Sequence, residues 1–166
     1  MLSTYLSDIA NCFDVTFSNP PEGQTQTVTA NYIDAAGNAA TDTAPTDNAK
    51  LDTTATNNAT VGLAIAISTD ANNDAIVNSV ELSGVNTFTS HVTVNSSAVA
   101  GDKVVISASN GSTALTPITH VLTAADITDG FDVTFTKPAD AQIQTVTAKY
   151  MDAAGNIATD AAPTDS

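Results

Sequence analysis

Hydrophobic and polar residues alternate strictly along two stretches near the C-terminal end of the chain. Residues 131–136 read Phe-Asp-Val-Thr-Phe-Thr, and residues 145–150 read Thr-Val-Thr-Ala-Lys-Tyr. Successive side chains of a β-strand point to opposite faces of its sheet, so each stretch predicts a strand with one buried face. Val and Thr favour strands further, because branching at Cβ suits an extended backbone.

Shorter hydrophobic patterns predict more strands between residues 49 and 125, and residues 123–126 predict a short helical turn. The residues that mark these strands are Val61, Leu63, Ala64 and Ile65; Phe88, Val92 and Val94; Val104 and Ile106; and Ile118, His120 and Leu122. Turns rich in Gly, Asn and Asp separate them. The whole pattern predicts an all-β fold with about seven strands in an antiparallel two-sheet sandwich. The side chains expected to point inward are Phe88, Val92, Val104, Ile106, Phe131, Val133, Phe135, Val146 and Tyr150.

One stretch of sequence occurs twice. Residues 8–48 align without a gap to residues 126–166 at an offset of 118, and about 27 of the 41 positions are identical. A period of that length is the size of a whole domain, so the chain is expected to be part of a tandem array. We therefore expect residues 1–48 to be the C-terminal part of one repeat and residues 49–166 to be a complete repeat. Pro45 and Pro163 predict short, fairly stiff linkers between repeats.

Residues 1–48 repeat the hydrophobic positions of the complete repeat without the strands that would cover them. These positions are Phe13, Val15, Phe17, Val28, Ala30 and Tyr32. A lone three-stranded sheet with such an exposed face is unfavourable, because each large apolar side chain left in water forgoes about 1.5–3 kcal/mol. The segment is therefore expected to be completed by another copy of the chain or by residues outside this sequence.

The charge of the chain is strongly one-sided. Eighteen acidic residues face four lysines, which gives a net charge of −14. This charge repels nucleic acid and anionic membrane surfaces, and no stretch is apolar enough to enter a membrane. Two interpretations remain. The charge keeps a long protein soluble, or bound cations neutralise part of it.

A twelve-residue loop matches the calcium-binding template at its ligand positions. The residues expected to bind calcium there are Asp70, Asn72, Asp74, Asn78 and Glu81. Calcium takes six to eight oxygen ligands, and this spacing directs alternate side chains to one centre. Ala75 stands where the template has glycine, so a left-handed turn there would be strained by about 1 kcal/mol. The alternative is a plain turn rich in Asn and Asp, flanked by strands.

A second acidic motif occurs once in each repeat, as Asp34-Ala-Ala-Gly-Asn38 and as Asp152-Ala-Ala-Gly-Asn156. Together with acids near the linker, it predicts calcium at the junction between repeats. The candidate ligands are Asp34, Asn38, Asp42, Asp52, Asp152 and Asn156, with Asp47 close by. The alternative is a hairpin turn, for which Gly-Asn supplies the left-handed residue.

The sequence holds no recognisable set of catalytic residues, so we expect neither an enzyme nor a small-molecule substrate. His120 is expected in the core and His91 toward water. Cys12 corresponds to Gly130 in the other copy, so the repeat needs no thiol there. No nucleophile elbow, paired-histidine zinc motif or phosphate-binding glycine loop is present.

Taken together, the residue runs 51–54, 70–81, 122–127, 131–135 and 150–156 resemble the bacterial Ig-like repeats of very long surface adhesins, of the biofilm-associated and repeats-in-toxin type. The resemblance implies an immunoglobulin-like antiparallel β-sandwich in tandem repeats, located outside the cell or on the bacterial surface. It also implies a calcium-stiffened structural extender that supports cell adhesion or biofilm formation. Its partners would be neighbouring repeats or other copies of the chain. Two alternatives are a segment of an extracellular fibre or matrix assembled by strand complementation between chains, and a sugar-binding module, which would need exposed aromatic residues.

Overall fold

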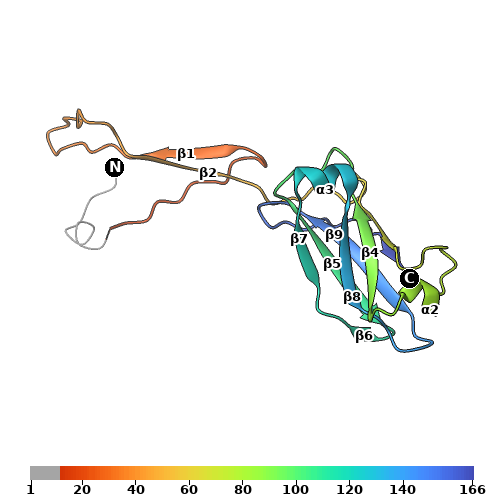
Figure 1. The fold of residues 1–166 in the computed structure, drawn as a ribbon. Helices are drawn as coiled ribbons and strands as arrows, with labels where there is room; N and C mark the ends of the chain where they lie inside the picture. The colour runs from red at the N-terminus through yellow and green to blue at the C-terminus, as the bar shows by residue number, and fades with distance from the viewer. Residues whose placement is uncertain (1–11) are drawn as a thin grey trace. The chain divides into compact units, whose positions relative to one another are not determined.

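The computed structural model describes residues 12–166, and the chain divides into two units, residues 1–52 and 53–166. We call these the N-terminal unit and the C-terminal unit (Figure 1). Strands are the main regular structure of the described residues, and all pairs between the named strands are antiparallel. The expected all-β class is therefore confirmed. The division falls a few residues beyond the expected boundary between residues 48 and 49.

The N-terminal unit contains a two-stranded sheet in its described part. Strand β1 (Thr25–Thr29) pairs with β2 (Thr46–Lys50). The expected three-stranded sheet is wrong, because residues 12–20 form no strand. Their counterpart in the C-terminal unit pairs only with a strand that the described part of the N-terminal unit does not contain. An extended segment without a neighbour has no ladder of hydrogen bonds to hold it as a strand.

The larger sheet of the C-terminal unit is built around two long strands that pair along their whole length. These strands are β5 (Lys103–Asn110) and β9 (Gln144–Met151). The outer edge of β9 carries β10 (Thr164–Asp165). The other edge of β5 carries β6 (Thr113–Ala114) and then β7 (Ile118–Val121).

The smaller sheet has three strands in the order β3, β4, β8. Their bounds are β3 (Ala64–Ile67), β4 (Thr87–Thr93) and β8 (Phe131–Thr136). The central strand β4 pairs with β8 so that Phe88 lies opposite Phe135 and Val92 opposite Phe131. Both sheets contribute side chains to one hydrophobic core.

The core consists of the side chains that the alternation predicts. Every expected inward-facing residue is buried except Phe88, which is half-buried against the core. Strands β8 and β9 alternate between buried and more exposed residues over their full length. Val61 and Leu63 are also buried, although they lie in the turn before β3 and not in the strand.

Two short helices carry the same type of N-terminal cap. Helix α3 (Ala124–Asp129) has the N-cap Thr123, which confirms the expected helical turn. Helix α2 (Ser79–Leu82) was not expected, and its N-cap is Asn78. In each case the cap side chain accepts a backbone hydrogen bond and an acidic residue three positions later bonds back, which satisfies donors at the helix start. Within residues 12–166, no helix has the length and apolar character needed to cross a bilayer.

The two units share their strand register where their sequences repeat. Thr46 lies opposite Thr29 in the N-terminal unit, and Thr164 lies opposite Thr147 in the C-terminal unit. Each member of the second pair is offset by 118 from its counterpart. The isolated bridges Ile33–Ala39 and Met151–Ile157 are related by the same offset. Similar residues thus form the same hairpin in both units.

Candidate functional site

The first half of the expected calcium loop is a compact turn between β3 and α2. The carboxylate of Asp70 accepts the backbone N–H groups of Asp74 and Ala75 at 3.2 and 2.8 Å. The side-chain oxygen of Asn72 also accepts the N–H of Asp74, at 3.0 Å. Oxygens of Asp70 and Asn72 therefore lie around one amide nitrogen. Ala75 has φ +66°, the left-handed conformation that the template's glycine position requires.

The second half of the loop caps the start of helix α2. The Oε2 atom of Glu81 accepts hydrogen bonds from the backbone and the side chain of Asn78, at 3.0 and 2.7 Å. The Oδ1 atom of Asn78 accepts the N–H groups of Val80 and Glu81 in return. The structure thus forms two separate clusters from the five expected ligands, one of Asp70, Asn72 and Asp74 and one of Asn78 and Glu81.

The oxygen ligands of this loop suit calcium only in its first half. Asp70 and Asp74 supply carboxylate oxygens and Asn72 supplies an amide oxygen, which suit a hard cation. Among residues 12–166, no three Asp, Glu, His or Cys side chains gather closely enough to hold a metal ion. Amide and backbone oxygens would therefore have to complete any coordination shell.

The paired motif at Asp34 and Asp152 forms the same closed turn in both units. Each aspartate accepts the backbone N–H and the side-chain N–H₂ of the asparagine four residues later, at 2.8–2.9 Å. Hydrogen bonds from Asn38 lower the pKa of Asp34. Burial raises the pKa of Asp152, but hydrogen bonds from Asn156 and from the N–H groups of Gly155 and Ala154 together lower it below its ordinary value. The turn therefore stabilises both carboxylates with its own N–H groups, as the hairpin interpretation requires.

The remaining candidate ligands lie apart from these turns. Asp42 is exposed, and Asp52 lies 4.0 Å from the Lys50 ammonium group in a surface ion pair. Such pairs contribute about 0–1 kcal/mol. In the C-terminal unit the counterpart of Asp42 is Asp160, and its carboxylate accepts the N–H groups of Asn58 and Ala59 at 2.9 and 3.0 Å. Asp160 thus closes the C-terminal unit by joining its last hairpin to its first turn.

Asn58 is a buried polar residue that hydrophobic patterns do not reveal. Its side-chain oxygen accepts the N–H of Tyr150 at 2.8 Å, and its amide group donates to the carbonyl oxygens of Asp160 and Ala161 at 3.3 and 3.4 Å. Only 1% of Asn58 is exposed. The repeat offset relates the candidate ligand Asp42 to Asp160, so the sequence offered a signal for Asp160, one of the partners of Asn58.

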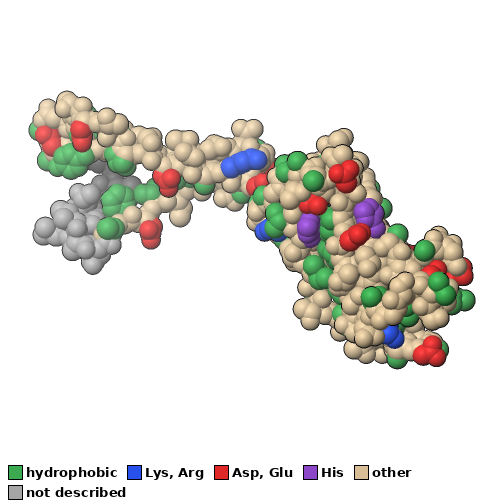
Figure 2. Space-filling view, viewed as in Figure 1, with side chains coloured by type: hydrophobic (Ala, Val, Ile, Leu, Met, Phe, Trp, Pro, Cys, Tyr) green, Lys and Arg blue, Asp and Glu red, His purple; other side chains and the backbone are tan. Residues whose placement is uncertain are grey.

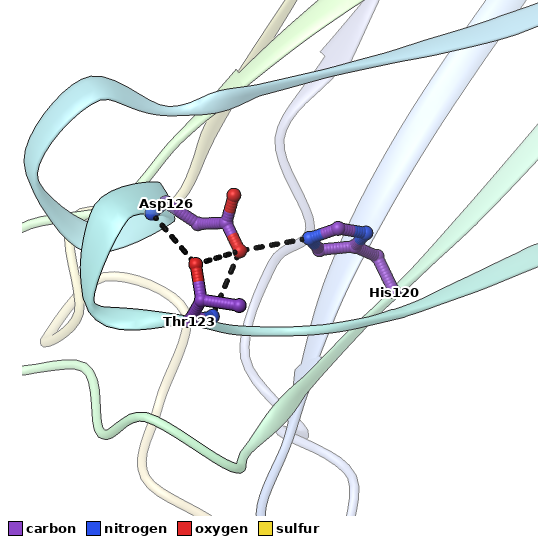
Figure 3. Close-up of polar contacts among 3 residues, drawn as sticks. All are labelled: His120, Thr123 and Asp126. Atoms are coloured by element: carbon purple, nitrogen blue, oxygen red, sulfur yellow. Dashed lines mark hydrogen bonds and ion pairs between the residues drawn. The ribbon is translucent and has the colours of Figure 1, made fainter.

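Both histidines bind aspartates. Figure 3 shows the Nε2 atom of His120 directed at the carboxylate of Asp126, 3.0 Å away, with Thr123 bound to the same carboxylate. The His120 ring stacks on Phe131 with centroids 3.9 Å apart. His120 is half-buried at the edge of the expected core. His91 is also half-buried and contacts Asp132 at 2.7 Å.

A cleft of about 620 Å³ opens beside the Asp70 loop. Ile67, Ile76 and Phe88 form part of its apolar lining, and Asp140 and Lys137 add charge. Phe88 is the one aromatic residue among those that line it. Sugar-binding sites commonly stack a sugar ring on an aromatic face, so this lining offers little for a sugar.

Searches of family models, of curated proteins and of solved structures found no match to this chain.

Proposed function

We propose that this chain is a calcium-stiffened structural extender module of a bacterial surface adhesin, which acts outside the cell in adhesion or biofilm formation. The observation that carries the proposal is the repeated hairpin, whose strand register recurs at an offset of 118. In the proposed role, modules that repeat along a chain set the distance between its ends. Sandwiches suit that task, because many inter-strand hydrogen bonds must break together under load.

The short connection between the units supports an extender. Pairing of β2 with β1 continues past the strand, since the backbone N–H of Leu51 donates to the carbonyl oxygen of Gln24 at 3.0 Å. The C-terminal unit begins at Thr53. Very little chain therefore separates paired backbone in one unit from the next unit, and short linkers limit bending.

Calcium is the second part of the proposal. We infer that Asp70, Asn72 and Asp74 hold the ion, because they form the cluster of hard oxygen ligands described above. A bound cation would offset part of the net charge of −14, and it would hold the loop between β3 and α2 in one conformation.

The test is a comparison of the full chain with calcium and with a calcium chelator. We expect calcium to raise the melting temperature and Asp70→Ala to remove one bound ion in titration calorimetry. Asp140→Ala is the matched control, because Asp140 is exposed and lies outside the loop. Equal melting temperatures and equal X-ray scattering in both conditions would exclude a stiffening role. Unchanged stoichiometry in Asp70→Ala would exclude this loop alone.

The second candidate function is a segment of an extracellular fibre assembled by strand complementation between chains. The observation in its favour is the exposed apolar side chains of the N-terminal unit, some of which are visible in green in Figure 2. The exposed side chains include Phe13 and Phe17. Concentration-dependent growth of filaments in sedimentation experiments would favour the fibre. A monomer at all concentrations would favour the extender.

A further inference from the structure

The same side chains are exposed in one unit and buried in the other. Phe13 is 63% exposed, whereas its counterpart Phe131 is 8% exposed. Tyr32 is 73% exposed, whereas its counterpart Tyr150 is 1% exposed. The other four hydrophobic positions of this set follow the same division, with each counterpart buried in the C-terminal unit. The C-terminal unit therefore shows what covers this apolar face when the repeat is complete.

Residues 53–122 cover this apolar face, and we call them the front segment. We call residues 126–166 and residues 8–48 the two back segments. Strand β8 of the back segment pairs with β4 of the front segment, and β9 pairs with β5. Tyr150 lies opposite Val104, and Phe131 opposite Val92. The back segment thus supplies one strand to the smaller sheet and two to the larger, and the front segment completes both.

Polar contacts between front and back segments are equally specific. Asn58 accepts the N–H of Tyr150, and Asp160 accepts N–H groups at the start of the front segment. The carboxylate of Asp165 accepts the N–H of Ile67 at 2.7 Å. The N-terminal unit retains all three back-segment partners, as Tyr32, Asp42 and Asp47. The N-terminal unit therefore carries apolar side chains together with the equivalents of one N–H donor, in Tyr32, and two carboxylate acceptors, in Asp42 and Asp47.

We propose that the described part of the N-terminal unit, residues 12–52, is a docking surface for a second front segment. The partner is a polypeptide with the chemistry of residues 53–122, contributed by a further repeat of the same kind. It would cover Phe13, Val15 and Phe17 with a strand equivalent to β4, and it would extend the β1–β2 sheet with a strand equivalent to β5. This inference goes beyond the extender function and holds whether or not the module binds calcium.

Exchange of front segments between two copies of this chain does not cover the surface. Each chain carries one front segment and two back segments. If the front segment of one copy moved to the N-terminal unit of another, it would uncover its own back segment. Exchange between copies therefore leaves as many apolar faces open as before.

Cys12 gives the proposal a test at a single position. Its counterpart Gly130 lies so close to β4 that an added Cβ atom would be 2.6 Å from His91 Nε2 and from the Val92 carbonyl oxygen. Cys12 also has a positive φ, +60°, as Gly130 does at +74°. A front segment with the sequence of residues 53–122 would therefore fit the N-terminal unit better after Cys12→Gly.

The experiment joins a second copy of residues 53–125 ahead of residue 8 of the chain, with Cys12 or with Cys12→Gly. The control fusion carries the same added residues in shuffled order. We expect hydrogen exchange of the β1 and β2 amides to slow by at least about tenfold relative to the shuffled fusion. We also expect the calorimetric enthalpy of unfolding to rise to nearly twice that of the original chain. Cys12→Gly should raise the melting temperature more in the fusion than in the original chain.

Two results would overturn the inference. One is unchanged exchange of the β1 and β2 amides in both fusions. The other is a dimer of the original chain, seen by analytical ultracentrifugation, in which these amides are already protected. That dimer would assign the surface to a second copy.

Discussion

The phenolic hydroxyl of Tyr150 donates a hydrogen bond to the carboxylate of Asp102 inside the C-terminal unit. The same hydroxyl accepts the N–H of Val99 at 3.2 Å, and Asp102 accepts the N–H of Ala153 at 2.9 Å. Burial, and then the bond to Asp102, raises the pKa of Tyr150 to about 12. The phenol therefore stays protonated and remains a donor. This pair ties the end of β9 to the turn before β5.

Replacing Tyr150 by phenylalanine removes this donor and leaves the buried Asp102 carboxylate without it. We expect Tyr150→Phe to lower the free energy of unfolding by about 1–3 kcal/mol. Tyr32→Phe is the matched control, because Tyr32 occupies the same repeat position and is 73% exposed. The control should stay within about 0.5 kcal/mol of the wild type. Urea denaturation followed by circular dichroism measures both, and equal losses would contradict the role of the buried pair.

Asn58 provides a second prediction about the buried polar network. Asn58→Ala removes the acceptor for the N–H of Tyr150, which lies inside the unit. The expected loss is about 2–3 kcal/mol, because a buried donor loses its partner and two further hydrogen bonds are lost with it. Asn57→Ala is the control, since Asn57 is exposed next to it. Thermal melts that do not distinguish the two variants would show that Asn58 does not hold the last hairpin to the first turn.

Period-two alternation predicted the strands of the C-terminal unit well because those strands bury one face and expose the other. Phe131, Val133 and Phe135 are buried while Asp132 and Thr134 between them are exposed, as the pattern requires. The same pattern in residues 13–17 did not produce a strand. Alternation reports a preference for an extended backbone, but a strand also needs a neighbour to pair with, and β4 has no counterpart in the described part of the N-terminal unit.

The candidate site was harder to predict from sequence than the strands. Spacing placed Glu81 at the end of a metal loop, yet the same spacing relative to Asn78 forms a helix cap. A glutamate three residues after an asparagine satisfies both templates, so local geometry decides between them. Asn58 and Asp102 were missed for a different reason. Their partners lie 92 and 48 residues away in the chain, and no short-range pattern records such pairs.

Acid should weaken the hydrogen bonds between the Asp126 carboxylate and residues His120 and Thr123, at the start of helix α3. Burial raises the pKa of Asp126, but hydrogen bonds from His120 and Thr123 lower it more, so the folded pKa lies below the ordinary value of 3.8. The unfolded state then takes up the proton first as the pH falls. The stabilisation is fully present above about pH 4 and is lost as the pH drops through the folded pKa.

Urea unfolding at a series of pH values between about 2 and 6 checks this prediction through the slope of stability against pH. Asp126→Asn should reduce that slope. Asp129→Asn, at the end of the same helix, is the control and should change it less, because Asp129 is exposed whereas Asp126 binds His120 and Thr123. Identical slopes for the wild type and Asp126→Asn would contradict the assignment.

Ala75 is strained in the left-handed conformation, with φ +66°, and this strain can be measured directly. A left-handed conformation costs a non-glycine residue about 1–2 kcal/mol, and glycine gives back about 0.4–1 kcal/mol through the entropy of the unfolded chain. Ala75→Gly should therefore raise the free energy of unfolding by about 0.5–1 kcal/mol. Ala139→Gly should lower it, because Ala139 is exposed and is not among the residues with positive φ. The opposite signs separate relief of strain from a general effect of glycine, and a loss of stability in both variants would show that the turn at Ala75 carries no strain.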